Sequence, residues 1–115
     1  MKPVGKFIHR DQAAIAAGGG NEIATLLSSV ETAGRFAVRE IIADVGAAPA
    51  PALPAADNRY AFVVAGDWEI DAGGERRSVG AGTSVFIPAG ASYAARLAGN
   101  APGKILEVAA PVARG

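Results

Sequence analysis

Short apolar segments separated by glycine- and proline-rich turn signals run along the whole chain. This regular spacing of turns constrains the fold more than any other feature. We expect strands at 7–9, 22–28, 35–45, 60–65, 68–71, 75–79, 84–87, 93–97 and 104–108. Gly73-Gly74 stands between two of these segments, a two-residue signal that is typical of a β-hairpin. Because turn signals recur about every eight to twelve residues, the sequence predicts an all-β barrel or sandwich.

Two stretches depart from this strand pattern. Asp11 is a candidate N-cap for a short helical turn through 12–17, which Gly18-Gly19-Gly20 would end. The segment 46–56 contains three prolines, and proline cannot donate a hydrogen bond to a β ladder. We therefore expect a helical turn near the N-terminus and a loop or edge strand ahead of 60–65.

The charge balance and the absence of cysteine exclude several classes of site. Eleven basic and eleven acidic residues cancel, so no net charge attracts the chain to nucleic acid or to an anionic membrane. Without cysteine there is no disulfide framework and no thiolate zinc site. His9 is the single histidine, which excludes centres built from several imidazoles. We expect His9 to be a surface or packing residue, and we expect no nucleic-acid or membrane partner.

The length of 115 residues suits a single domain that spans 1–115. The N-terminus lacks the apolar core and cleavage site of a signal peptide. No apolar run approaches the roughly 20 residues needed to span a bilayer. We expect a soluble cytoplasmic protein.

Three acidic residues form a possible cation site. Asp67, Glu69 and Asp71 alternate with apolar residues, which places their carboxylates on one face of a strand. A group of carboxylates can bind a hard cation, but alternation on the solvent face of an antiparallel sheet explains the pattern more simply. We expect these acids to pair with 75–77 across the hairpin as ordinary surface charge.

Glycines and a proline recur at spacings that match two motifs. Gly82 is followed by five residues and then by Pro88-Ala89-Gly90, and Tyr93 stands after two further residues. Upstream, Gly46 and Gly66 have the spacing of the two ends of a second pattern. Together these spacings resemble the two sequence motifs of the cupin family.

The resemblance implies an all-β fold, the double-stranded β-helix or jelly-roll barrel of small single-domain cupins, with the short helical turn at its N-terminus. Cupins hold a divalent metal with three imidazoles and a carboxylate, and the matching positions here are Ala52, Pro54, Arg59 and Tyr93. Alanine and proline side chains have no lone pair, arginine is a permanent cation, and neutral tyrosine is a poor ligand. The resemblance therefore implies a cupin-like protein with no metal and no other cofactor.

Arg59 and Tyr93 project into the barrel in the cupin register, and they are the candidate ligand-binding residues. A buried arginine is costly unless a partner offsets the loss of water. Asp57 or Glu40 would supply that partner from within the protein, whereas a ligand carboxylate or phosphate would supply it from outside. We assign no catalytic residue and no metal ligand.

Three functions follow from these residues. The first is a metal-independent protein that binds a small molecule in the barrel. That molecule would be an anion if Arg59 binds it directly. The second is a metal-free isomerase or epimerase-type enzyme with Tyr93 as its acid, although the sequence shows no convincing base beside it. The third is a non-catalytic structural or regulatory homodimer, in which the apolar segments 7–8 and 23–27 lie at or near the interface.

Overall fold

Nine strands form two antiparallel sheets in the part of the chain that the computed structural model describes, which is residues 5–51, 53 and 55–112. The six-stranded sheet has the order β1-β2-β3-β9-β4-β7, and the three-stranded sheet has the order β6-β5-β8. In chain order the strands are β1 (Ala14–Gly18), β2 (Asn21–Leu27), β3 (Ala37–Ala43), β4 (Asp57–Ala65), β5 (Trp68–Ala72), β6 (Glu75–Val79), β7 (Ser84–Ile87), β8 (Tyr93–Leu97) and β9 (Gly103–Pro111). The predicted all-β class is confirmed.

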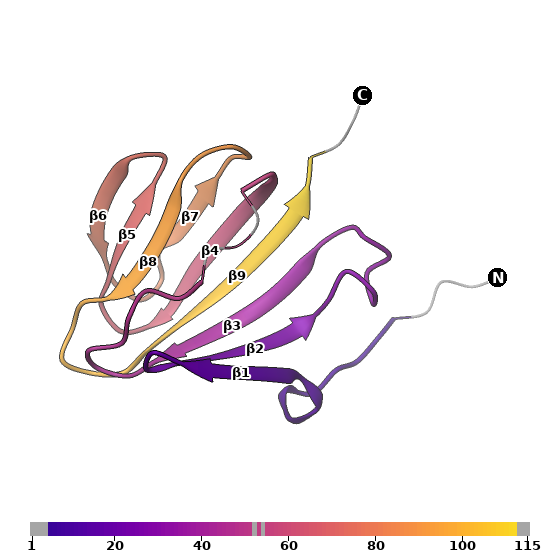
Figure 1. The fold of residues 1–115 in the computed structure, drawn as a ribbon, viewed down its shortest axis with the longest axis horizontal. Helices are drawn as coiled ribbons and strands as arrows, with labels where there is room; N and C mark the ends of the chain where they lie inside the picture. Colours follow the sequence, from indigo (N-terminus) through magenta and orange to yellow (C-terminus); the bar gives the residue numbers. More distant parts are fainter. Residues whose placement is uncertain (1–4, 52, 54, 113–115) are drawn as a thin grey trace.

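The two sheets are not joined into a hydrogen-bonded barrel. Figure 1 shows β5, β6 and β8 beside β4 and β7, with β1 and β2 at the opposite end of the larger sheet. Among the described residues, β6 pairs only with β5 and β7 pairs only with β4. An open seam therefore remains between β6 and β7. Since β8 likewise pairs only with β5 among the described residues, the fold is a two-sheet jelly roll whose barrel is not closed by hydrogen bonds.

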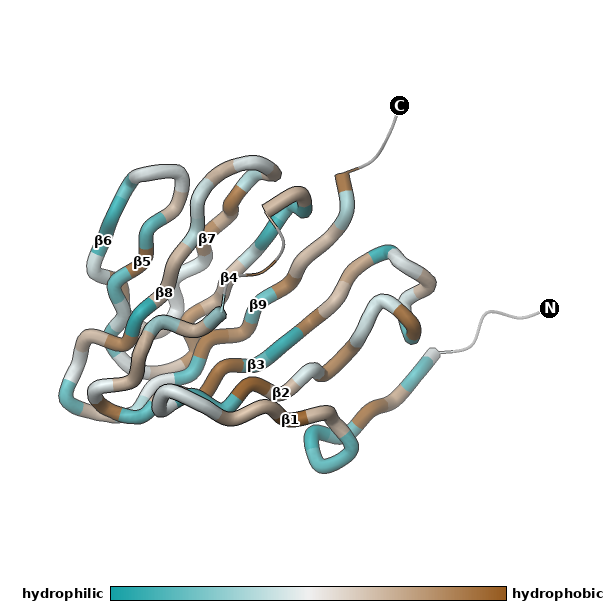
Figure 2. Tube along the Cα trace, in the orientation of Figure 1, coloured by the Kyte–Doolittle hydropathy of each residue, from teal (hydrophilic) through white to brown (hydrophobic). Residues whose placement is uncertain are grey.

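The core lies between the two sheets and follows the two-residue period of the strands. Ile41 and Ile105 from the larger sheet and Trp68 from the smaller sheet are each no more than 1% exposed. Figure 2 shows apolar stretches along β2, β3 and β9, in the middle of the larger sheet. Burial of each side chain of this size contributes about 1.5–3 kcal/mol to the free energy of folding. The same alternation turns two charged residues, Arg59 of β4 and Glu107 of β9, toward this interior.

The glycines of the two motifs are needed at tight turns. Gly46, Gly66, Gly82 and Gly90 all have positive φ angles, of 80, 88, 92 and 85°. At Gly66 a Cβ atom would lie 2.8 Å from the Cα atom of Gly103, closer than two carbons can pack. A side chain is therefore excluded there by both backbone conformation and space.

The N-terminal region differs from the prediction. A 3-10 turn spans Arg10–Gln12, and His9, not Asp11, caps it by accepting a hydrogen bond from the amide of Asp11. The predicted helical turn through 12–17 is wrong, because Ala14–Gly18 forms β1 and pairs with β2. The strand expected at 7–9 is absent among the described residues. Strand pairing across a turn at Gly19 and Gly20 thus prevails over the local capping signal.

The remaining strand boundaries agree with the sequence pattern to within three residues. The segment 46–56 is a loop in its described residues. None of the helices in the described ranges is long and apolar enough to cross a membrane.

Candidate functional site

Arg59 is a buried cation whose side-chain hydrogen bonds, among the described residues, go to backbone carbonyl groups. It lies on β4 between Ala109 of β9 and Ile87 of β7, and its side chain faces the interior with 2% exposure. Its Nη2 atom donates to the carbonyl oxygen of Ala91 and, at 3.4 Å, to that of Pro88. Its buried Nε atom has no hydrogen-bond partner among the described residues. One guanidinium donor is therefore left unsatisfied.

Tyr93 approaches the same interior from the opposite sheet. It begins β8, pairs with Ala72 of β5 and is 8% exposed. Its hydroxyl donates a hydrogen bond to Oε2 of Glu107 across the space between the sheets. Burial, followed by the negative charge of Glu107 and this hydrogen bond, raises the pKa of Tyr93 well above its ordinary value. The phenol is therefore neutral at physiological pH.

Glu107 is the buried carboxylate at the centre of the group. It is 1% exposed and lies opposite Arg39 in the β3–β9 ladder. The Nε atom of Arg39 donates to Oε1 of Glu107 at 2.5 Å, and its Nη2 atom donates to the carbonyl oxygen of Pro51 at 2.6 Å. We call Arg39, Arg59, Tyr93 and Glu107 the interior cluster.

The sequence placed two members of the interior cluster correctly and missed the other two. Arg59 and Tyr93 both face the interior, as predicted. Arg39 and Glu107 had one available signal: each is a charged residue on the apolar face of a predicted strand, two positions from Ile41 and Ile105 respectively. Their pairing itself depends on strand order, which the pattern does not contain.

The predicted internal partners of Arg59 are wrong. Glu40 faces the outside of the sheet, where it accepts from Nε of Arg10 at 2.7 Å and lies 3.6 Å from Nζ of Lys104. Within the described ranges, neither Glu40 nor Asp57 forms an ion pair with Arg59. The reason is the strand period: Glu40 is one residue from the inward-facing Arg39 and so points to the opposite face.

The interior cluster carries an excess of positive charge. Arg39 and Arg59 each bring one positive charge, Glu107 brings one negative charge, and Tyr93 is neutral. Arg39 and Tyr93 already engage both carboxylate oxygens of Glu107. A buried charge without an opposite partner is costly, so the arrangement favours an added anion.

These residues do not suit a divalent metal. Ala52 and Pro54 lie outside the described residues, while Arg59 is a cation and Tyr93 retains its proton. No group of three or more His, Cys, Asp or Glu side chains comes together in the described part of the chain. Arg59 and Tyr93 therefore do not supply the imidazole and carboxylate donors that a cupin-type metal centre uses.

The acidic residues of the β5 region behave as surface charge. Oε1 of Glu69 lies 3.6 Å from Nε of Arg76 and 3.7 Å from Nη2 of Arg96, and all three side chains are at least 32% exposed. Asp71 accepts a hydrogen bond from the amide of Gly74 at 3.0 Å, which supports the hairpin turn. The predicted pairing across the hairpin is confirmed for Arg76.

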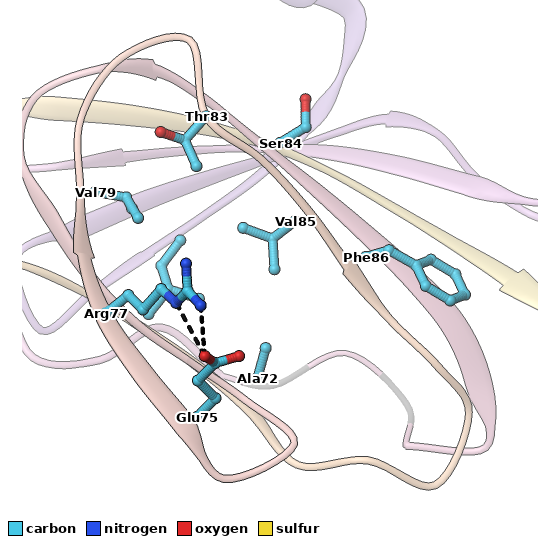
Figure 3. A pocket seen from close by; sticks show the side chains of 9 residues that line it. Ala72, Glu75, Arg77, Val79, Thr83, Ser84, Val85 and Phe86 are labelled. Atoms are coloured by element: carbon cyan, nitrogen blue, oxygen red, sulfur yellow. Dashed lines mark hydrogen bonds and ion pairs between the residues drawn. The ribbon is translucent and has the colours of Figure 1, made fainter.

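A hollow lies next to the interior cluster, at the seam between β6 and β7. Its volume is about 390 Å³, and Figure 3 shows side chains of β5, β6 and β7 around it. We call it the seam hollow; it is lined by Ile70, Ala72, Glu75, Arg77, Val79, Thr83, Ser84, Val85 and Phe86. None of the five hollows found among the described residues is lined by Arg59 or Tyr93.

Comparisons with known proteins give one family model and several solved structures of the same fold. The family model described as "Cupin domain" matches residues 43–109. An RmlC-like cupin from Shewanella frigidimarina is 21% identical, with a TM-score of 0.75 over 97% of this chain and 96% of that one. KdgF from Halomonas sp. is 17% identical, with a TM-score of 0.76 and 96% of each chain covered.

A predicted oxalate decarboxylase from Thermotoga maritima is 14% identical, with a TM-score of 0.79 over 93% of this chain and all (100%) of that one. No protein with a curated description matches the sequence. At these identities, the similarity to the solved structures is one of fold alone.

Proposed function

The chain belongs to the cupin family, and on that premise we propose that it binds a small organic anion between its two sheets without using a metal. The observation that carries the proposal is the buried Nε atom of Arg59, which has no partner among the described residues. The excess positive charge of the interior cluster supports the same conclusion. An anion is the ligand that would satisfy the free donor and the charge together.

The expected ligand has a planar acid group and an apolar body. A guanidinium presents its donors in a fixed fork that matches a carboxylate or a phosphate. The side chains around the interior cluster are otherwise apolar, among them Ile87, Ala95 and Ala109. A small carboxylic acid with a hydrocarbon or aromatic body fits this combination better than free phosphate does.

Replacing Arg59 with Met tests the proposal. Methionine has a similar volume and no charge, and we expect affinity for benzoate, measured by NMR titration, to fall by about 2–3 kcal/mol. The matched control is Arg96→Met, because Arg96 lies on the outer face of β8 and is 55% exposed. An Arg59→Met variant that is folded and binds benzoate as the parent does would overturn the proposal. Inorganic phosphate serves as the second probe and should bind more weakly.

A metal-free isomerase or epimerase-type activity is the second candidate, and one contact favours it. Glu107 accepts the Tyr93 hydroxyl proton in a hydrogen bond, so a base stands beside the candidate acid. A carboxylate and a phenol in contact can relay a proton to or from a bound carbon acid. The expected signature is deuterium exchange from heavy water into the C–H group next to the carboxylate of a bound ligand. Tyr93→Phe should lose this exchange while it still binds the ligand. Exchange at the same rate in both proteins would exclude this role.

The third candidate, a homodimer with a structural or regulatory role, rests on the outer face of the six-stranded sheet. The strand registers align Val38, Val108, Tyr60 and Phe86 in one row across β3, β9, β4 and β7. Phe86 is 63% exposed and Tyr60 is 40% exposed. Two copies packed through this row would cover apolar area that a monomer leaves in water.

A further inference from the structure

The seam hollow exists because the two sheets do not pair there. β6 is the last strand of the smaller sheet and β7 is the last strand of the larger one. Where their backbones stay apart, side chains of both strands surround an open space (Figure 3). The seam hollow therefore lies between the edge strands of the two sheets, at the margin of the interior.

The lining of the seam hollow combines an apolar wall with one cation. Ile70, Val79 and Val85 supply the wall. Arg77 lies opposite Ile70 in the β5–β6 ladder, so its side chain points to the inner face of β6. Figure 3 shows its guanidinium extending between Val79 and Ala72 into the hollow. A cation beside apolar walls suits an acid group attached to an apolar body.

The present partner of Arg77 is weakly held. Glu75 Oε1 accepts from Nη2 of Arg77 at 2.6 Å and from Nε at 3.1 Å. The two residues are neighbours on the same face of one strand, and their side chains are 71% and 66% exposed. Exposed pairs of this kind contribute little to stability. A ligand acid can therefore replace Glu75 on Arg77 at small cost.

The seam hollow lies next to the interior cluster. Ala72, on its lining, pairs directly with Tyr93 in the β5–β8 ladder. Val85, also on its lining, is two residues before Ile87, the partner of Arg59 in the β4–β7 ladder. Two residues along a strand span about 6.6 Å. One small molecule can thus extend from the hollow toward Arg59.

We infer that the ligand is a molecule with two acid groups joined by a short apolar chain. One acid group binds Arg59, the apolar chain lies against Val85, Ile70 and Val79, and the second acid group binds Arg77 at the seam. This inference rests on the proposed function, because it takes the contact of the first acid group with Arg59 from there. Arg77 is then the residue that selects a diacid over a monoacid.

The test compares adipate with hexanoate, which share six carbons and differ in one acid group. The parent protein should bind adipate more tightly, and Arg77→Met should reduce adipate affinity roughly fivefold or more while leaving hexanoate unchanged. Arg76→Met is the matched control, because Arg76 is the preceding residue on β6 and faces the outer side toward Glu69. Glu75→Gln should tighten adipate binding, because it removes the acid that competes for Arg77.

The outcomes separate this inference from the proposed function. Equal loss in the Arg77 and Arg76 variants, or hexanoate bound as tightly as adipate by the parent, would overturn the diacid inference and leave anion binding at Arg59 standing. If Arg77→Met loses adipate affinity while Arg59→Met binds adipate as the parent protein does, both the diacid inference and anion binding at Arg59 are overturned. If Arg77 serves only to protect an exposed sheet edge, its substitution should promote aggregation without changing affinity.

Discussion

Replacing Glu107 with Gln is expected to destabilise the fold by about 3–5 kcal/mol. Glu107 is 1% exposed and accepts from Nε of Arg39 at 2.5 Å and from the hydroxyl of Tyr93. Glutamine keeps the shape but removes the only negative charge of the interior cluster, leaving Arg39 and Arg59 buried without an opposite charge. With its oxygen toward Arg39, the glutamine would also place its NH2 group against the Tyr93 hydroxyl, which could then no longer donate to position 107.

Urea unfolding measures the loss directly. Trp68, the single tryptophan, is 1% exposed and reports the core by its fluorescence. The midpoint should fall while the slope of the transition stays constant. At about 4 °C per kcal/mol, the melting temperature should fall by roughly 12 °C or more. Glu69→Gln is the matched control, because Glu69 lies on the outer face with 32% exposure, and it should cost less than about 1 kcal/mol.

The reasoning is refuted if Glu107→Gln costs no more than Glu69→Gln. A second variant separates charge from space: Arg39→Met combined with Glu107→Leu removes both members of the ion pair and fills the volume with apolar groups. We expect this double variant to recover a large part of the stability lost in Glu107→Gln. A double variant that is less stable than Glu107→Gln would show that packing, and not an unpaired charge, explains the loss.

Three further outcomes are expected. Untagged protein should carry no stoichiometric Mn, Fe, Ni, Cu or Zn, and about one equivalent that survives dialysis would contradict this. Light scattering at micromolar concentration should give twice the monomer mass, and Val108→Glu, in the outer row with Tyr60 and Phe86, should give a monomer. A parent protein that stays monomeric at high concentration counts against the dimer. In a Tyr60→Phe background, Tyr93 is the single tyrosine, and its phenolate absorbance should appear only when alkali unfolds the chain. Because its pKa is raised in the folded state, its contribution to stability is complete below its ordinary pKa and is lost as the pH rises above that value; ionisation without unfolding would disprove the burial argument.

Most strands could be predicted because their signals are local. The apolar run 60–65 and the turn-bounded segment 93–97 predicted β4 and β8, and the glycines at 73–74 predicted the hairpin between β5 and β6. The resemblance to the cupin motifs then placed Arg59 and Tyr93 on inward faces, where both are buried. Their role in ligand binding remains a prediction. The N-terminal error had the opposite cause, since β1 is a strand only because β2 pairs with it.

The sequence by itself therefore determined where the chain turns, which segments are extended and which side chains share a face, because each depends on residues that are close along the chain. Apart from the hairpin at 73–74, only the tertiary structure decided which strands are neighbours. Arg39 and Glu107 are 68 residues apart and meet because β9 lies next to β3. The seam hollow likewise depends on β6 and β7 remaining unpaired. Strand order arises from the packing of the whole core, and no short stretch of sequence contains it.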